Sequence, residues 1–475
     1  MPGRRNAARK VLDGRGGGWP LLIAGVVLAS LAVVCGPWPA LEAQQAPAED
    51  GPGPVPAALR VEVSDDGLET VTLPAFEVPG LLHRGPDPVP YGDSPDWSNT
   101  LRRQVGGLQV VDIDGDMDLD VVVGCYISNS FPPYEDWENL IYRNVGGVLE
   151  ANPSWISADE VSTGDIQVGL INADLLPDVF AANGGGSLSP SVIYFGGVGG
   201  PSTSPGWSSN DSAWNNYAVL FDYDDDGDVD VFTANQGNSQ NDPFRPMYGF
   251  ENDAGTLETT PSWQSAETSI QNFLAFGLFD DDEWPDLAVS KWANFESGIY
   301  RNDGGSMDTT PTWTTGDTDT DKGVAWADVD ANGWVDLALG RDPTLVYFND
   351  TGVLTAGYSS SATFFGHSDL RWADVDGDED PDLAEIHFSN GVVNIYLNQG
   401  GVLDSTPSWS YNSAGAGTAI AFGDITGNGY ADLVVGNSGD PSVMVFYNQG
   451  VPDPIFTDGF ESGDTNSWSD VFPAP

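Results

Sequence analysis

Asp222, Asp224, Asp226, Asp228 and Asp230 place five carboxylates at alternate positions within nine residues. Like charges packed this tightly repel one another strongly once they are partly desolvated, so such a segment is stable around a cation. Calcium binds about six to eight oxygens, which alternate side chains of a tight acidic loop direct at one point. Magnesium keeps most of its waters, and zinc favours Cys and His, of which the chain has two and three. The segment therefore predicts a calcium-binding loop.

This nine-residue pattern occurs seven times, and each copy ends in an aspartate that is followed by a short apolar run. The copies are residues 112–120, 170–178, 222–230, 278–286, 328–336, 374–382 and 424–432. Their final aspartates are 46 to 58 residues apart. A repeat of this period is typical of solenoids and propellers.

The seven loops differ in the oxygen ligands that they offer. By analogy with other acidic calcium loops, we expect side chains at positions one, three, five and nine and a backbone carbonyl at position seven to bind the ion. Candidate ligands in the most complete loops, the first, third and sixth, are Asp112, Asp114, Asp116, Asp118 and Asp120, then Asp222, Asp224, Asp226, Asp228 and Asp230, then Asp374, Asp376, Asp378, Asp380 and Asp382. Those of the fifth loop and the weaker seventh loop are Asp328, Asp330, Asn332 and Asp336, then Asp424, Asn428 and Asp432.

The second and fourth loops depart from the pattern because Leu170 and Leu278 occupy the first position. The remaining acids around Asp174 and Asp282 are expected to bind calcium weakly or not at all. The whole chain is therefore expected to hold about three to five structural calcium ions.

Two further motifs keep the same period, and they indicate the elements that position the loops. One reads Ile141-Tyr142-Arg143-Asn144 in the first repeat, and the other reads Pro153-Ser154-Trp155. Each repeat holds four short β-type segments separated by Gly, Asn and Asp turns, which in the fifth repeat are residues 324–329, 337–340, 345–348 and 354–359. Four strands in roughly 45–50 residues make one propeller blade. A stacked solenoid is the rival architecture, but it needs distinct polar caps.

The ends of the repeat region favour a closed ring. The seventh repeat stops at Gly450 without a Pro-Ser-Trp segment, whereas a matching Pro95-Asp96-Trp97 precedes the first loop. We therefore predict an all-β fold, a seven-bladed β-propeller of four-stranded blades, in which an N-terminal strand completes the last blade. The ring is expected to span residues 94–450.

The loop pattern D-x-D-G-D-x-x-x-D followed by an apolar run, repeated around a ring, resembles the FG-GAP/VCBS repeat family, whose blades form integrin α-chain-like propellers. This resemblance covers about three quarters of the chain. It implies that each loop joins the first two strands of a blade and binds calcium structurally.

The segments outside the ring predict export. Basic residues lead into an apolar stretch, residues 20–34, whose length of about 15 residues suits a secretory signal better than a membrane span. Residues 1–43 are therefore assigned to a signal peptide, 44–93 to a Pro/Ala linker with a short β segment, and 451–475 to a tail with a possible sorting motif. The mature chain is expected to be a secreted or cell-surface protein and a monomer without a membrane span.

Composition narrows the classes of function. The 71 acidic and 16 basic residues give a net charge of −55, which is at odds with nucleic-acid binding because phosphate contacts need Lys and Arg. Bound cations would offset the self-repulsion of such a charge. Cys125 is the one cysteine that follows the signal, so an internal disulfide is excluded and a buried strand thiol is expected.

No catalytic constellation is evident in the sequence. His83, His367 and His387 each stand apart from a recognisable nucleophile or acid, so an enzyme is not expected, although a polysaccharide lyase or hydrolase is a remote alternative. We expect a non-catalytic binding or adhesion module for an extracellular protein or glycan. A lectin-like role is the main alternative, since Trp284, Trp334 and Tyr430 occupy the seventh loop position in three repeats, where they either stack on sugar rings or pack against neighbouring blades.

Overall fold

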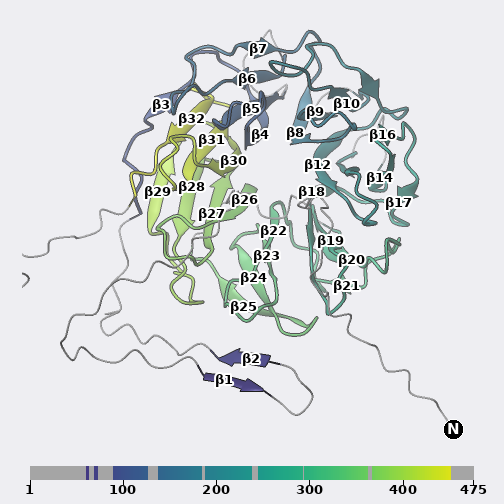
Figure 1. The fold of residues 1–475 in the computed structure, drawn as a ribbon, viewed down its shortest axis with the longest axis vertical. Helices are drawn as coiled ribbons and strands as arrows, with labels where there is room; N and C mark the ends of the chain where they lie inside the picture. The colour runs from purple at the N-terminus through teal and green to yellow at the C-terminus, as the bar shows by residue number, and fades with distance from the viewer. Residues whose placement is uncertain are drawn as a thin grey trace, which may run out of the picture.

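The computed structural model describes residues 60–63, 69–72, 89–126, 137–184, 188–237, 244–292, 294–361 and 366–450, with the backbone alone for 60–63, 69–72 and 367–368. The predicted signal peptide, His83 and the tail lie outside these residues. Seven four-stranded antiparallel sheets stand around a common centre, as predicted (Figure 1). In the described residues, no helix is long and apolar enough to cross a membrane.

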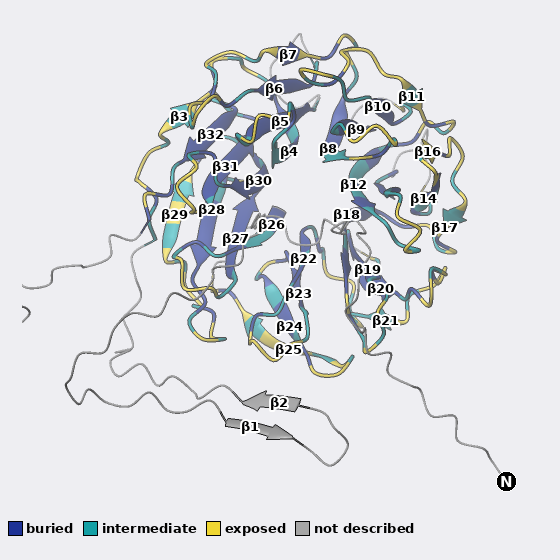
Figure 2. Ribbon diagram, in the orientation of Figure 1, coloured by how far each residue is buried: buried dark blue, intermediate teal, exposed yellow. Residues whose placement is uncertain are grey.

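Each sheet is one blade, and its first strand lies nearest the centre of the ring (Figure 1). The first strands are β4 (Val105–Val111), β8 (Thr163–Gly169), β12 (Asn215–Phe221), β18 (Gln271–Gly277), β22 (Val324–Ala327), β26 (His367–Ala373) and β30 (Gly417–Gly423). The second strands are β5 (Asp120–Cys125), β9 (Asp178–Asn183), β13 (Asp230–Asn235), β19 (Asp286–Lys291), β23 (Asp336–Leu339), β27 (Asp382–His387) and β31 (Asp432–Asn437). All second strands are buried along their whole length (Figure 2), which explains their near-continuous apolar runs.

The third and fourth strands complete the blades toward the outside. The third strands are β6 (Leu140–Tyr142), β10 (Val192–Tyr194), β14 (Tyr248–Phe250), β20 (Gly298–Tyr300), β24 (Leu345–Asn349), β28 (Val392–Tyr396) and β32 (Val443–Phe446). The fourth strands are β7 (Trp155–Ile156), β11 (Trp207–Ser208), β17 (Trp263–Gln264), β21 (Trp313–Thr314), β25 (Leu354–Ser359), β29 (Trp409–Asn412) and β3 (Trp97–Ser98). Two separate hairpins are β1 (Arg60–Val63) with β2 (Glu69–Thr72), and β15 (Asn252–Asp253) with β16 (Thr256–Leu257).

An N-terminal strand closes the ring, as the displaced tryptophan motif predicted. β3 pairs with β32, with Trp97 opposite Val445 and Ser98 opposite Met444. Asn99 extends the junction, because its Oδ1 accepts hydrogen bonds from the backbone N–H groups of Ser442 and Val443 at 3.0 Å. The first and last parts of the ring are thus held by both backbone and side-chain bonds.

The tryptophan and tyrosine motifs keep the same period because they meet across blade boundaries. The Trp that opens a fourth strand packs edge-on against the aromatic ring of the next blade's third strand. These pairs, with ring-centroid distances, are Trp97–Tyr142 (5.2 Å), Trp155–Tyr194 (5.3 Å), Trp207–Phe250 (6.1 Å), Trp263–Tyr300 (6.1 Å), Trp313–Tyr347 (5.3 Å) and Trp409–Phe446 (5.2 Å). Each pair contributes about 0.5–1.5 kcal/mol beyond its buried area.

The apolar core is divided into clusters that lie between neighbouring blades, such as Val329 and Val346 of the fifth blade with Leu383 and Tyr396 of the sixth. Cys125 is buried in one of these clusters, as expected, and burial raises the pKa of its thiol to about 12.

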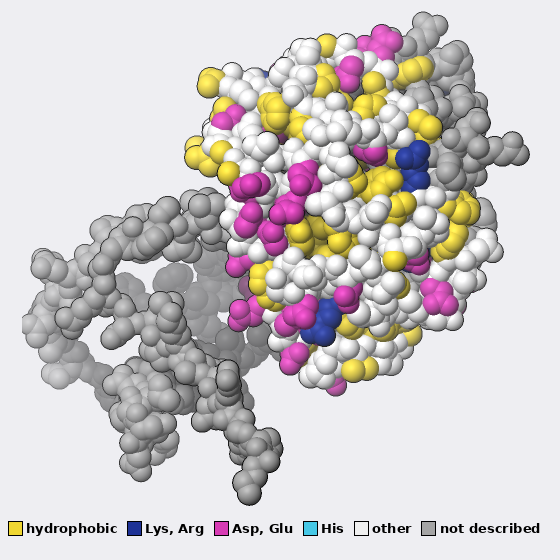
Figure 3. Space-filling view, turned by 90° about the vertical axis from the view of Figure 1, so that its right-hand side faces the viewer, with side chains coloured by type: hydrophobic (Ala, Val, Ile, Leu, Met, Phe, Trp, Pro, Cys, Tyr) yellow, Lys and Arg dark blue, Asp and Glu magenta, His cyan; other side chains and the backbone are white. Residues whose placement is uncertain are grey.

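The two faces of the disc differ in charge. The turns from first to second strand carry the seven acidic loops, and they share one face, here the acidic face, with the turns from third to fourth strand. The turns from second to third strand and the links between blades form the opposite face. In the edge-on view of Figure 3, Asp and Glu side chains gather toward one side of the disc.

Candidate metal centre

The ninth loop position is the anchor of each acidic loop. Its aspartate is the first residue of the second strand and is fully buried in all seven blades, at Asp120, Asp178, Asp230, Asp286, Asp336, Asp382 and Asp432. In the sixth blade, Asp382 Oδ2 accepts a bond from the N–H of Val375 at 2.7 Å, and its Oδ1 accepts one from the N–H of Asn398 at 2.7 Å. The carboxylate therefore joins its own loop to the turn that follows the third strand.

The first loop position folds the loop. In the first blade, Asp112 accepts bonds from the N–H groups of Gly115 at 2.8 Å and Met117 at 2.9 Å. Equivalent bonds to Asp222, Asp328, Asp374 and Asp424 hold the other four loops that begin with Asp. In these five loops the fourth and sixth residues are left-handed, with φ between 55° and 95°. The fourth loop has neither left-handed residue and the second has one, at Leu175, so the loss of the first aspartate changes the backbone as well as the ligand set.

Carboxylates of positions one, three and nine meet in four loops. These are the groups Asp112, Asp114 and Asp120, then Asp222, Asp224 and Asp230, then Asp328, Asp330 and Asp336, then Asp374, Asp376 and Asp382. In each group the oxygens lie within 4.8 Å of one another. Oxygens bound to one calcium at about 2.3–2.6 Å lie no farther than about 5 Å apart, so each group has the dimensions of a single cation site.

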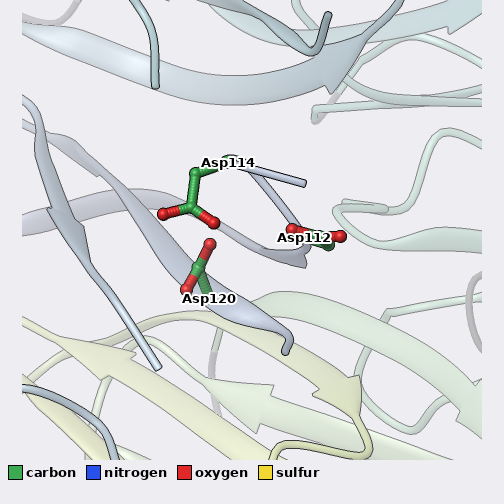
Figure 4. Close-up of side chains that lie close together, drawn as sticks. All are labelled: Asp112, Asp114 and Asp120. Carbon is green, nitrogen blue, oxygen red and sulfur yellow. The ribbon is translucent and has the colours of Figure 1, made fainter. Parts of the chain in front are cut away.

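Buried oxygens without a partner mark the same place. Asp114 Oδ1, Asp224 Oδ1 and Asp376 Oδ1, all at loop position three, are buried and accept no hydrogen bond. Figure 4 shows the Asp114 and Asp120 carboxylates turned toward each other beside Asp112. Uncompensated buried carboxylate oxygens are costly, and a cation at this point would satisfy them.

Electrostatics point the same way, because burial opposes ionisation of the anchors. Burial, with a smaller contribution from the neighbouring loop carboxylates, raises the pKa of Asp230 and of Asp382 to about 8. Burial likewise raises the pKa of Asp376 to about 7. A cation bound at this point would favour the ionised carboxylates and so lower their pKa.

Positions five and seven serve the loop backbone. The side chains of Asp118, Asp228 and Asp380 at position seven accept bonds from the N–H groups of Gly146, Ala254 and Gly400, in the turn after the third strand. At position five, Asp116, Asp226 and Asp378 accept a bond from the N–H of position seven, and the same bond is made by Asn332 and Asn428. In the seventh loop, Asp424, Asn428 and Asp432 make the same hydrogen bonds as their counterparts in the other loops that begin with Asp. Only two of these three side chains are acids.

The fourth loop holds its acids with an arginine. Arg301 lies 3.0 Å from Asp280 through Nε and 3.1 Å from Asp282 through Nη2. The guanidinium thus neutralises the third and fifth positions of a loop that begins with Leu278. In the first blade, Arg143 stands at the same point of its motif and contacts Asp114 at 3.0 Å, whereas the third blade has Glu251 there, whose charge helps to raise the pKa of Asp224, after burial and Asp226.

Asparagines that the sequence analysis did not assign connect six of the seven loops to the next blade. In six blades the third strand is followed or ended by an Asn whose Nδ2 donates to the carbonyl at position two of the preceding blade's loop. The donors and acceptors are Asn144 to Ile425, Asn252 to Ile171, Asn302 to Tyr223, Asn349 to Phe279, Asn398 to Val329 and Asn448 to Val375, at 2.6–2.8 Å. The signal was the Asn of the Tyr-Arg-Asn motif; the second blade has Gly196 there.

The aromatic residues at position seven come from different blades. Trp284 and Trp334 are partly buried, and Tyr430 is 37% exposed. A hollow of about 400 Å³ opens beside Trp334 and includes Phe348, Asp330 and Asn332 in its wall. Tyr430 instead packs beside Gly450 and near Gly377 of the sixth loop.

His387 is less isolated than its sequence position suggested. Its Nε2 lies 3.1 Å from Glu385 Oε1, and both side chains are fully buried between blades five and six. The spacing of two residues along β27 places both on one face of the strand, which the sequence could have indicated. Tyr396 and Thr344 also donate to Glu385, so these side chains form a hydrogen-bond network inside the core.

The fold is a β-propeller, and four of its acidic loops bring three carboxylates together that could hold a metal ion. A family model described as FG-GAP-like repeat matches residues 374–435, which contain the sixth and seventh loops. This match and the seven-bladed ring support the resemblance to FG-GAP propellers that the loop pattern indicates.

Comparison with solved structures finds two crystal structures of BBS1N in complex with ARL6DN, one soaked with lead and one with mercury. They are 12% and 13% identical to this chain, with a TM-score of 0.48 in each case. The alignments cover 74% of this chain and 95% and 94% of those chains. No curated protein matches the chain.

The asparagine contacts give a first prediction. Asn398→Ala removes a buried bond to Val329 and leaves that carbonyl unsatisfied, so the free energy of unfolding should fall by about 1–3 kcal/mol. Equilibrium denaturation with and without calcium measures the change. Asn152→Ala, at an exposed position, is the control, and an equal effect of both substitutions would contradict the assigned role.

Proposed function

We propose that the chain is a calcium-loaded propeller that acts outside the cell as a non-catalytic binding module. The meeting of three carboxylates in each of four loops carries the calcium part of the proposal. Calcium is favoured among hard cations because the loops supply many protein oxygens, whereas magnesium retains its waters. Four ions would occupy the first, third, fifth and sixth loops, and the seventh loop would be a weaker fifth site.

The proposed role of calcium is structural. Each ion would draw together the first, third and ninth positions of one loop and so join the first and second strands of a blade. It would also offset part of the full chain's net charge of −55, and the ring has no disulfide among its described residues. Export is supported by the basic and apolar N-terminal pattern of the sequence.

A second candidate function is lectin-like binding on the acidic face. The hollow beside Trp334 favours it, because an aromatic ring and the oxygens of a calcium loop line the same opening. Stacking on an aromatic ring and hydrogen bonding to Asn332 would suit a neutral sugar. Trp284 and Tyr430 would extend this surface.

Calcium titration tests the main proposal. Isothermal calorimetry on the metal-stripped protein should detect about four tight sites, and the melting temperature should rise with calcium. Asp376→Asn should remove one site, since Asp376 offers a buried oxygen without a partner. Asp308→Asn, exposed and outside the loops, should leave the stoichiometry unchanged. A metal-stripped protein that takes up no calcium would refute the proposal.

The fourth loop allows a gain-of-site experiment. Leu278→Asp combined with Arg301→Leu restores the first ligand and removes the internal cation, so the double variant should bind one more calcium ion than the wild type. Arg301→Leu alone should lower stability in the absence of calcium, because Asp280 and Asp282 lose their partner. If the double variant shows no extra site by calorimetry, the reading of Arg301 as a substitute cation is wrong.

Glycan binding tests the second candidate. On a glycan array, Trp334→Ala should weaken any bound neutral glycan about tenfold or more, and chelation of calcium should weaken it as well. Met117→Ala, an exposed apolar residue of the first loop, is the matched control. Unchanged binding in Trp334→Ala would assign the glycan to another surface.

A further inference from the structure

Lys322 lies on the opposite face, just before the innermost strand of the fifth blade. Its backbone is held at both ends: its N–H donates to the carbonyl of Gly340 at 2.8 Å, and its own carbonyl accepts a bond from the Ser290 hydroxyl. The start of this side chain is therefore fixed by the second strands of blades four and five.

The ammonium of Lys322 lies between two aromatic rings. Its Nζ is 4.6 Å from the ring centroid of Trp292 in blade four and 5.1 Å from that of Phe388 in blade six. Cation–π contacts of this kind are attractive, but they do not neutralise the charge. Three consecutive blades thus build one aromatic and cationic cluster.

Two acids of this region pair with other cations. Arg341 holds Asp321, the residue before Lys322, through bonds of 2.6 Å and 3.0 Å, and Lys291 pairs with Glu267. Burial is the one cause that lowers the pKa of Lys322, to about 8, and no carboxylate of the described residues counteracts it. In a chain of net charge −55, a half-buried ammonium without a counterion is an exception that calls for an anionic partner.

The surroundings suit an anion better than the acidic face does. Of the nine Lys and Arg residues between 89 and 450, six lie at the opposite face: Arg102, Arg103 and Lys322 in links between blades, Arg245 and Arg341 in turns from second to third strand, and Lys291 at the end of β19. Most of the acidic residues, by contrast, belong to the loops of the acidic face. The opposite face therefore carries the larger share of the positive side chains, which favours the approach of an anion.

Space for a ring lies next to this cluster. Phe388 is 43% exposed and forms one side of a hollow of about 400 Å³. Ala414, Gly415 and Ala416 provide a flat, small-residue wall, and Ser389 and Asn390 provide polar groups. A sugar ring in this hollow would stack on Phe388, the ring whose centroid lies 5.1 Å from Lys322 Nζ.

We propose that Lys322, Trp292 and Phe388 form a binding site for a carboxylate-bearing sugar, that is, a hexuronate unit of an acidic glycan. The site names a ligand class for the proposed binding module and uses no calcium ligand. Its ammonium selects the carboxylate, and its aromatic rings and small-residue wall select the ring.

The test measures binding of trigalacturonate to the full chain by calorimetry. Wild type should bind trigalacturonate at least tenfold more tightly than its methyl ester or a neutral trisaccharide, and high salt should weaken binding. Lys322→Met should abolish the preference for the acid, Lys322→Arg should retain part of it, and Phe388→Ala should weaken the acid and the ester alike. Arg102→Gln removes one exposed positive charge from the same face and should leave binding unchanged.

Two controls keep the outcome unambiguous. Each variant should keep the calcium stoichiometry of wild type, which shows that the ring is intact and separates this proposal from the calcium proposal. No binding by a calcium-loaded wild type, equal binding of acid and ester, or equal loss in Arg102→Gln and Lys322→Met would overturn the uronate site. Binding of an acidic peptide in place of trigalacturonate would overturn it as well.

Discussion

A buried carboxylate at the head of each second strand is the constraint on which the rest of the propeller depends. Because the strand is enclosed on both faces, the carboxylate is removed from water and must be satisfied inside the protein. Its two oxygens accept bonds from the loop that precedes it and from the turn that follows the third strand, as Asp120 does with Ile113 and Asn144. The blade's geometry at the acidic face follows from these two bonds.

The repeat structure made much of this fold predictable from sequence. Seven blades, four strands in each and closure through Trp97 were all predicted, and the four strands of the fifth blade differ from the predicted segments by no more than two residues at an end. The residue at position one separates the loops in the sequence as it does in the structure, because the five loops that begin with Asp have two left-handed residues and the two that begin with Leu do not. Local chemistry, repeated seven times, carries this information.

Contacts between blades were beyond the sequence patterns. Asn448 donates a hydrogen bond to Val375, which lies 73 residues earlier in the sequence. The ammonium of Lys322 lies between the rings of Trp292 in the preceding blade and Phe388 in the next blade. A motif with a fixed period shows that a residue recurs but does not show which neighbour it faces. The role of the Asn of the Tyr-Arg-Asn motif and the pairing of Arg301 with the fourth loop follow from the arrangement of the strands in three dimensions.

The loops that lost the first aspartate show that blade cohesion and cation binding are separable. The second and fourth loops still receive the amides of Asn252 and Asn349, and their anchors Asp178 and Asp286 are as buried as the others. What differs is the charge: the second loop retains few acids, and Arg301 neutralises the fourth. Where three carboxylates remain together, the hydrogen bonds set the shape of the loop but leave the repulsion between them. An ion at such a loop would therefore act mainly by removing that repulsion, on a backbone whose turn the first aspartate already holds.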